Sequence, residues 1–330
     1  MKPTAVFDSY WRFATERQNI FFNRLEGKPP PWSRDPILST YKFTNAYRAS
    51  DRVSQYLISE VIYKGPQEPR ELFFRIVLFK LFNKIETWQL LETQLGEIRH
   101  QSFRFADYDK VLSHALNAGG PIYSAAYIMA AGRDIFGVQR KHQAHLRLLE
   151  LMLSEHLPER LCECRTMQQG FQLLKSYPLI GDFLAYQLIT DLNYSELTQF
   201  SEMEFTMPGP GALDGIRKCF ASLGDLSEVD AIRYMADRQQ DEFERLGLTF
   251  RSLWGRPLQL IDTQNLFCEV DKYARVRHPE VTGISGRTRI KQKFAKPNGR
   301  ISYFYPPKWH LAVPVEGRAS SVVPRQQTLL

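Results

Sequence analysis

The sequence predicts an all-α domain that is followed by a basic C-terminal extension. Apolar residues recur at three- and four-residue spacing along most of the chain, and patterns typical of strands are scarce. The positive charge is concentrated at the end: the chain from Lys272 onward has 12 Lys/Arg against 2 Asp/Glu, whereas residues 1–271 have 31 against 34. We therefore expect a helical unit of one or two lobes at residues 1–282 and a basic extension at 283–330.

The helices are expected where this spacing is clearest. The first ends at Gly27, where a run of prolines follows. The segment "ISYFY" at 301–305 is the best candidate for a strand. The predicted helices cover residues 7–26, 51–63, 68–82, 86–95, 107–117, 140–155, 166–176, 181–193, 227–247 and 257–268, and a further one is expected in "ALDGIRKCF" after the turn at 207–212.

Several classes of protein are disfavoured by the sequence. No run of about 18 apolar residues occurs, and the N-terminus lacks the order of a secretory signal, so we expect a cytoplasmic protein without membrane contact. The four cysteines form no CxxC pair, and no GxxxxGK[ST] loop is present. His142 and His145 have no third ligand in an HExxH pattern, so we expect surface histidines, no metal and no cofactor.

The segment "FQLLKSYPLIGDFLAYQLITDLNYS" at 171–195 predicts two helices joined by a tight turn. A helix–hairpin–helix of this kind presents backbone N–H groups and the positive end of a helix dipole to a DNA phosphate, here at Gly181. The usual hairpin, hPGhG, has two glycines and this one has a single glycine, so an ordinary helical hairpin remains an alternative.

Acids and glycines follow this hairpin. Asp191 and Glu204 could act as a general base, or stabilise positive charge, beside a nucleotide that is flipped out of the stack. The alternative is that Asp191 ends a helix and Glu204 is a solvated loop acid. Gly209 and Gly211 would let the backbone approach a phosphate or base closely, unless the "PGPGA" turn is simply a stiff loop.

Two further segments are candidates for contact with nucleic acid. Asn45, Arg48 and Arg52 lie around the start of a predicted helix, where they could contact a phosphate or a base edge, or else form surface pairs. The basic segment "GRTRIKQKFAKPNGR" at 286–300 is either a DNA-binding element or a solvated terminus. Its candidate DNA-binding residues are Arg287, Arg289, Lys291 and Lys293.

The segment "QLIDTQNLFCEVDKYAR" at 259–275 is unusually rich in hydrogen-bonding side chains. Amides adjoin apolar residues, and a tyrosine stands between cations, which favours a functional site or a buried polar network over a solvated face. Asp262 is a further candidate catalytic acid. The candidate substrate-binding residues are Gln264, Asn265, Glu269, Lys272, Tyr273 and Arg275.

Four motifs together carry a family resemblance: "YKFTNAYRASDRVSQYLISEVIY", "DLNYS", "PGPGALDGIRKCF" and "DTQNLFCEVDKYAR". Over residues 7–277 the chain resembles the α-glutamyl/putrescinyl thymine pyrophosphorylases of phage and bacteria. It also resembles the related helical domain of 5-hydroxymethyldeoxyuridine DNA kinases. The resemblance implies a fold similar to that of the helix–hairpin–helix DNA glycosylases.

The resemblance also implies a reaction in which an amine, from an amino acid or polyamine, displaces pyrophosphate from the 5-methylene group of a flipped modified uracil in DNA. Lys272 and Arg275 then suit the pyrophosphate, Asp191 or Glu204 suits the amine proton, and the two amides suit the pyrimidine edge. DNA, a small amine and a separate hydroxymethyluracil DNA kinase are the implied partners. A glycosylase that excises a modified base, and a non-catalytic DNA-binding module, remain alternatives.

Overall fold

The computed structural model describes residues 1–125, 129–295 and 303–313. Within this part of the chain, helices dominate and the strands form a single small antiparallel pair, β1 with β2. The α-helices are α1 Ala5–Leu25, α2 Pro36–Thr40, α3 Arg52–Tyr56, α4 Pro69–Phe82, α5 Ile85–Leu95, α6 Phe105–Asn117, α7 Arg133–Phe136, α8 Lys141–Ser154, α9 Leu157–Cys162, α10 Met167–Lys175, α11 Asp182–Leu192, α12 Pro210–Cys219, α13 Glu228–Asp237, α14 Gln239–Arg245 and α15 Leu260–Arg277. The short elements are β1 Lys2–Pro3, β2 Phe220–Ser222, the 3₁₀ turns η1 Arg48–Ser50 and η3 Pro307–Trp309, and the π-helical turn η2 Leu57–Ile62.

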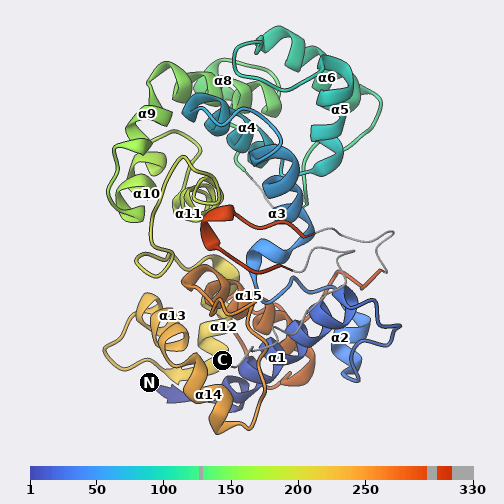
Figure 1. Cartoon of the computed structure of the whole chain (residues 1–330), viewed down its shortest axis with the longest axis vertical. Coiled ribbons are helices and arrows are strands. Elements are labelled where there is room, and N and C mark those ends of the chain that lie inside the picture. Colours follow the sequence, from blue (N-terminus) through green and yellow to red (C-terminus); the bar gives the residue numbers. More distant parts are fainter. Residues whose placement is uncertain (126–128, 296–302, 314–330) are drawn as a thin grey trace, which may run out of the picture.

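The helices gather in two lobes (Figure 1). One lobe contains α1, α2 and α12 to α15, so both ends of the helical region lie in it, and the other contains α4 to α11. In the described part of the chain, residues 41–56 and residues 193–209 each cross from one lobe to the other. Because these crossings bring backbone and polar side chains into the middle of the molecule, they need hydrogen-bonding partners there.

The closest helix contact in the first lobe is between α12 and α15. A Cβ atom at Gly215 would lie 2.0 Å from the backbone oxygen of Phe267, so only glycine fits at this crossing. Capping residues fix where the helices begin: the Thr4 hydroxyl accepts from the amide of Val6 in α1, and Ser227 and Asp230 form a capping box at α13. These local features hold α15 in the centre of its lobe.

The structure confirms the mostly helical class and corrects several details. The helix expected at 227–247 is interrupted at Arg238, and the helix expected at 257–268 continues to Arg277. The strand expected at 301–305 is wrong for its described part, because Tyr303 to Tyr305 form no strand; residues 301 and 302 lie outside the described residues. No helix in the described ranges is long and apolar enough to cross a membrane.

The expectation of surface histidines is wrong, because both side chains are fully buried. His142 Nε2 lies 2.7 Å from an Asp109 carboxylate oxygen, and His145 Nδ1 lies 2.9 Å from the Tyr123 hydroxyl. Burial lowers the pKa of His145 to about 4. These histidines tie the α6–α8 region together as hydrogen-bonded core residues.

The C-terminal part of the described chain packs against the helices. The segment Tyr303–Val313, which includes η3, lies between the two lobes in Figure 1. The Tyr305 hydroxyl is 2.7 Å from the Ser50 hydroxyl, and the Lys308 ammonium donates to the carbonyls of Ser195 and Thr198, both at 2.7 Å. This segment therefore contacts both crossings of the chain, and we call it the C-terminal cover.

Candidate functional site at the crossing between the lobes

A buried ion triad joins the first crossing to the second lobe. Asp191, at the end of α11, is completely buried; one carboxylate oxygen lies 2.8 Å from the Arg48 guanidinium and the other lies 3.1 Å from the Lys80 ammonium of α4. Burial alone would raise the pKa of Asp191, but the positive charges of Arg48 and Lys80 outweigh burial and hold it below 3.8. The Arg48 guanidinium also donates to Gln187 and to the Tyr194 hydroxyl.

Asp262 reaches the same arginine from α15 in the first lobe. One carboxylate oxygen accepts from the Arg48 backbone N–H at 2.7 Å, and the other accepts from the Gln259 N–H at 3.0 Å. The carboxyl is buried, and burial raises its pKa to about 6. Arg48 therefore links the two predicted acids, through its side chain to Asp191 and through its backbone to Asp262. We call these three residues and Lys80 the polar centre.

A second ion pair lies beside the polar centre, beneath the C-terminal cover. The Arg256 guanidinium is 2.6 Å from a Glu202 carboxylate oxygen of the second crossing. The Trp309 ring lies over Arg256, with 3.9 Å between the guanidinium carbon and the ring centroid, and it also contacts the Tyr194 ring edge-on. The cover therefore screens the Arg256–Glu202 pair from solvent.

The predicted hairpin is formed by α10, the turn at 176–181 and α11. Gly181 is the N-cap residue of α11, and a Cβ there would meet nothing within 4 Å. Leu179, which occupies the position of the first glycine in hPGhG, has a φ of 67° and so adopts the left-handed conformation that glycine favours. Its side chain fills the space beside Gly132. Leu179 is therefore a non-glycine residue in a conformation that is strained for residues with a side chain.

The remaining polar residues of α15 tie it to the first crossing. Asn265 donates to the Thr44 hydroxyl at 3.0 Å, and Glu269 accepts from the Thr44 N–H at 2.9 Å. Lys272 pairs with Glu269 at 2.6 Å and lies over the Phe43 ring. The segment at 259–275 is therefore built largely as a buried polar network.

Three further predicted residues are part of this network or border it. Arg275 pairs with Asp271, whose carboxylate also lies 3.0 Å from the Lys218 ammonium. Tyr273 donates to Asp35 at 2.6 Å, and Gln264 is buried beside Gly209. Arg275, Tyr273 and Gln264 therefore lie outside the ion triad.

The glycines of the "PGPGA" turn allow close packing. A Cβ at Gly209 would lie 2.7 Å from the Phe183 ring, and one at Gly211 would lie 2.3 Å from the Cys268 sulfur. Glu204 is half-buried nearby, and its backbone carbonyl accepts from Arg233. The structure does not bring Glu204 into the ion triad, and the contact of these glycines with a phosphate or base stays a prediction.

The other predicted cations divide into paired and exposed ones. Arg287 lies 3.0 Å from an Asp214 carboxylate oxygen, while Arg52, Arg289, Lys291 and Lys293 are exposed. Arg52 stands apart from Arg48, whose side chain points into the protein, so the two do not form the joint cluster that the sequence suggested.

Sequence reasoning missed several members of the site. Lys80 is a single lysine within the apolar run "RIVLFKLF", and a cation in such a run signals a buried ion pair. Tyr194 follows Asp191 within the same short motif. Glu202, Arg256 and Trp309 carried no comparable signal, because only the fold brings them together.

The sequence of this chain is similar to those of known proteins. A family described as 5-hmdU DNA kinase, helical domain, matches residues 4–283. A curated relative, the 5-hmdU DNA kinase of Bacillus phage SP10, is 28% identical over 291 residues, which cover 81% of this chain and 45% of the relative. The chain thus spans less than half the length of that relative. No solved structure matches the chain significantly.

Proposed function

This chain belongs to the family of the 5-hmdU DNA kinase helical domain, and we propose that it binds DNA containing a 5-hydroxymethyluracil-type base and holds that base for chemistry on its 5-substituent. The observation that carries the proposal is a row of exposed cations, Arg289, Lys291 and Lys293, fixed along the surface of the protein. Phosphate contacts supply most of the affinity for DNA, and such a row suits them.

Backbone hydrogen bonds give this row a defined position. The Arg289 carbonyl accepts from the Arg275 guanidinium at 3.0 Å. The Lys42 N–H donates to the Gln292 carbonyl at 3.0 Å, and the Phe294 N–H donates to the Thr40 carbonyl at 2.9 Å. The cations therefore lie beside the start of the first crossing and the end of α15, where a DNA backbone would pass along them. We call residues 289–293 the basic row.

The salt dependence of DNA binding tests the role of the basic row. Replacing Arg289, Lys291 and Lys293 together by glutamine should lower the slope of log affinity against log salt concentration by up to about 2.7, at about 0.9 for each phosphate that is no longer neutralised. Fluorescence anisotropy with a duplex containing 5-hydroxymethyluracil measures this slope, and a thymine duplex of the same sequence shows the preference for the modified base.

A matched control changes the same charge elsewhere. Arg104, Lys110 and Arg133 are exposed on the distant lobe, and their triple glutamine variant should change the slope by less than about 0.9, the value for one phosphate. Equal decreases in the two triple variants would contradict a defined DNA track, and no preference for the modified duplex would contradict the choice of base.

For the chemistry itself we propose the transfer suggested by the four motifs. The amine nitrogen would attack the 5-methylene carbon, the carbon–oxygen bond would break, pyrophosphate would leave with its electron pair, and a carboxylate would take the amine proton. Asp262 suits this last role best, because its pKa of about 6 lies nearest to neutrality. Asp191 suits it poorly, since Arg48 and Lys80 lower its pKa and so make it a weaker base.

Excision of the base and simple DNA binding are the competing functions, and one mass measurement separates all three. The protein is incubated with DNA that carries the pyrophosphorylated base and with candidate amines, and the nucleosides are then weighed. Transfer gives an enlarged base, glycosidic cleavage gives alkali-labile abasic sites, and a binding module leaves the DNA unchanged. These 330 residues contain no GxxxxGK[ST] loop, so the activating phosphoryl groups would come from elsewhere.

The finer description of the fold is also a proposal. The hairpin between α10 and α11, with Leu179 in a left-handed conformation, supports a helix–hairpin–helix arrangement like that of DNA glycosylases. A boundary near residue 282 between the helical domain and a basic extension is proposed with it. Gly181 would then present the N-terminus of α11 to a phosphate.

A further inference from the structure

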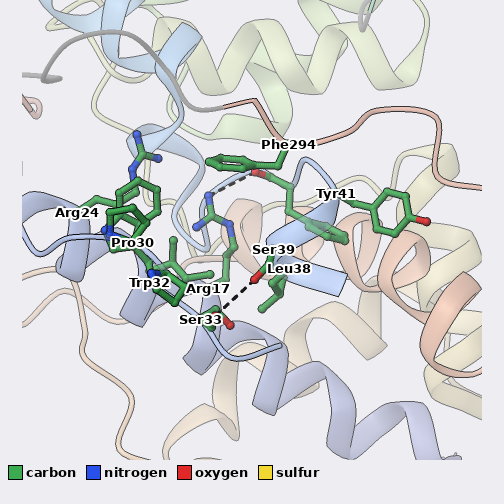
Figure 2. A pocket seen from close by; sticks show the side chains of 12 residues that line it. Arg17, Arg24, Pro30, Trp32, Ser33, Leu38, Ser39, Tyr41 and Phe294 are labelled. Atoms are coloured by element: carbon green, nitrogen blue, oxygen red, sulfur yellow. Dashed lines mark hydrogen bonds between the residues drawn. The ribbon is translucent and has the colours of Figure 1, made fainter. Parts of the chain in front are cut away.

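A pocket of about 200 Å³ opens beside the first crossing, separate from the polar centre (Figure 2). Its walls come from α1, from α2 and the loop before it, from the start of the first crossing, and from Phe294, which directly follows the basic row. The lining residues are Arg17, Ile20, Arg24, Pro30, Pro31, Trp32, Ser33, Leu38, Ser39, Tyr41, Phe43 and Phe294. We call it the aromatic pocket.

Rings form much of its wall. Trp32 and Phe294 meet edge-on at right angles, with 6.4 Å between their centroids, and Phe43 also lines the pocket, whereas the Tyr41 ring points away from Trp32 and Arg24 in Figure 2. Phe294 keeps 38% of its surface exposed although the Phe294 N–H is bonded to Thr40. Phe294 is thus fixed through its backbone at the mouth of the pocket, while its ring remains partly exposed to solvent. Such a ring is suited to stacking on a flat ring of a ligand.

The charged groups of the lining are two guanidiniums, Arg17 and Arg24, without a carboxylate among the lining residues. Arg17 is buried and uses one nitrogen to donate to the Phe43 carbonyl at 3.3 Å and to the Asn45 side chain at 2.8 Å. Burial, and next the like charge of Arg24, lower the pKa of Arg17 to about 10, while Glu269 and Asp51 oppose this from outside the pocket. An anion in the pocket would relieve this repulsion between the guanidiniums.

From these features we infer that the aromatic pocket binds one pyrimidine nucleotide, with its ring beside Trp32 and Phe294 and its phosphate on the Arg24 side. Arg24 lies over the Trp32 ring at 5.3 Å, so one wall supplies both a stacking face and a phosphate donor. A volume of about 200 Å³ is below the 300–1,000 Å³ of pockets for drug-sized ligands, which suits one ring with its substituent.

The choice of ligand rests on the proposed DNA role, because the basic row ends at the pocket mouth and would lead a DNA strand to it. Ring and phosphate could come from a free mononucleotide or from a nucleotide of a DNA strand. Calorimetric titration of the full chain with 2′-deoxyuridine monophosphate tests the first source. Competition between this nucleotide and a single-stranded oligonucleotide tests the second.

The expected result is saturable binding of the mononucleotide that weakens at least about tenfold in Arg24→Gln, the loss expected for a charge-assisted bond to phosphate. Phe294→Ala, at a partly exposed position, should also weaken binding. Arg34→Gln removes a neighbouring exposed arginine outside the pocket lining and should leave the affinity unchanged. Competition by the oligonucleotide identifies the DNA strand as the source, and its absence identifies the free nucleotide.

Failure of this inference can be told apart from failure of the proposed function. No binding of the mononucleotide, or equal affinity in Arg24→Gln and the parent, would overturn the inference while DNA binding by the basic row could persist. Conversely, nucleotide binding without any affinity for duplex DNA would sustain the pocket and overturn the proposed DNA role.

Discussion

Replacing Asp191 by asparagine would leave Arg48 and Lys80 buried without their shared counter-charge. The carboxylate is completely buried and lies 2.8 Å and 3.1 Å from the two cations. Removing one partner of a buried ion pair costs about 3–5 kcal/mol, because the remaining charge stays desolvated. At roughly 2 °C per kcal/mol for a chain of this size, the midpoint of thermal unfolding should fall by roughly 6–10 °C. Calorimetry or circular dichroism measures that midpoint.

Two matched variants make this expectation specific. The double variant Asp191→Asn with Lys80→Met also removes one of the two cations that faced Asp191. It should recover part of the lost unfolding free energy, since methionine suits the apolar surroundings of α4. Glu204→Gln changes a half-buried loop acid and should alter the unfolding free energy by less than about 0.5 kcal/mol. If Asp191→Asn were as stable as Glu204→Gln, the triad would not hold the lobes together, and that result would favour a catalytic role for Asp191.

Three other expectations concern packing, pH and the C-terminal cover. Gly215→Ala should lower the free energy of unfolding, measured in urea, by about 1–3 kcal/mol or more, because its Cβ would meet the α15 backbone. Gly181→Ala has open space around its Cβ and should lower this free energy by about 1 kcal/mol or less. Folding raises the pKa of the Asp262 carboxyl from 3.8 to about 6, so its protonated form stabilises the fold fully below pH 3.8, and this stabilisation is lost as the pH rises to 6. Between these pH values the unfolding free energy of the parent should fall by about 3 kcal/mol relative to that of Asp262→Asn. A constant difference between the two proteins would contradict the raised pKa. Trp309→Ala should loosen the cover, so trypsin should cleave after Lys308 faster than in the parent, and unchanged cleavage would contradict the anchoring role.

The helical class was predictable because long apolar stripes are a local signal. The apolar run at 68–82 predicted α4 closely, and the turn before Gly181 predicted the hairpin. The segment at 301–305 misled because its consecutive aromatic residues at 303–305, which favour a strand, also suit an extended segment that lies between two lobes. Sequence alone does not say whether such a segment has a strand beside it.

The sequence predicted the acidic residues of the candidate site, and it did not predict the residues that surround them. Arg48 was a candidate because it lies near the start of a predicted helix, Asp191 because it follows the hairpin turn, and Asp262 because its segment is rich in hydrogen-bonding side chains. The structure brings these three together. The neighbouring ion pair of Glu202 and Arg256 joins distant parts of the chain, and no local pattern relates these two residues. Burial also reversed one expectation, since polarity suggested that the histidines of α8 lie at the surface, whereas hydrogen-bond partners allow them inside.

A single short segment, residues 43–50, connects the aromatic pocket with the polar centre. Phe43 lines the pocket, and the Asn45 side chain accepts from Arg17 of the pocket and donates to the Ser50 carbonyl at 2.5 Å. Arg48, between them, holds both acids of the polar centre, and the Ser50 hydroxyl contacts Tyr305 of the C-terminal cover. Hydrogen bonds and a few covalent bonds of the first crossing therefore link Arg17 of the pocket to Arg48 of the polar centre. This continuity explains in physical terms why one stretch of sequence carries so many polar residues of the first crossing.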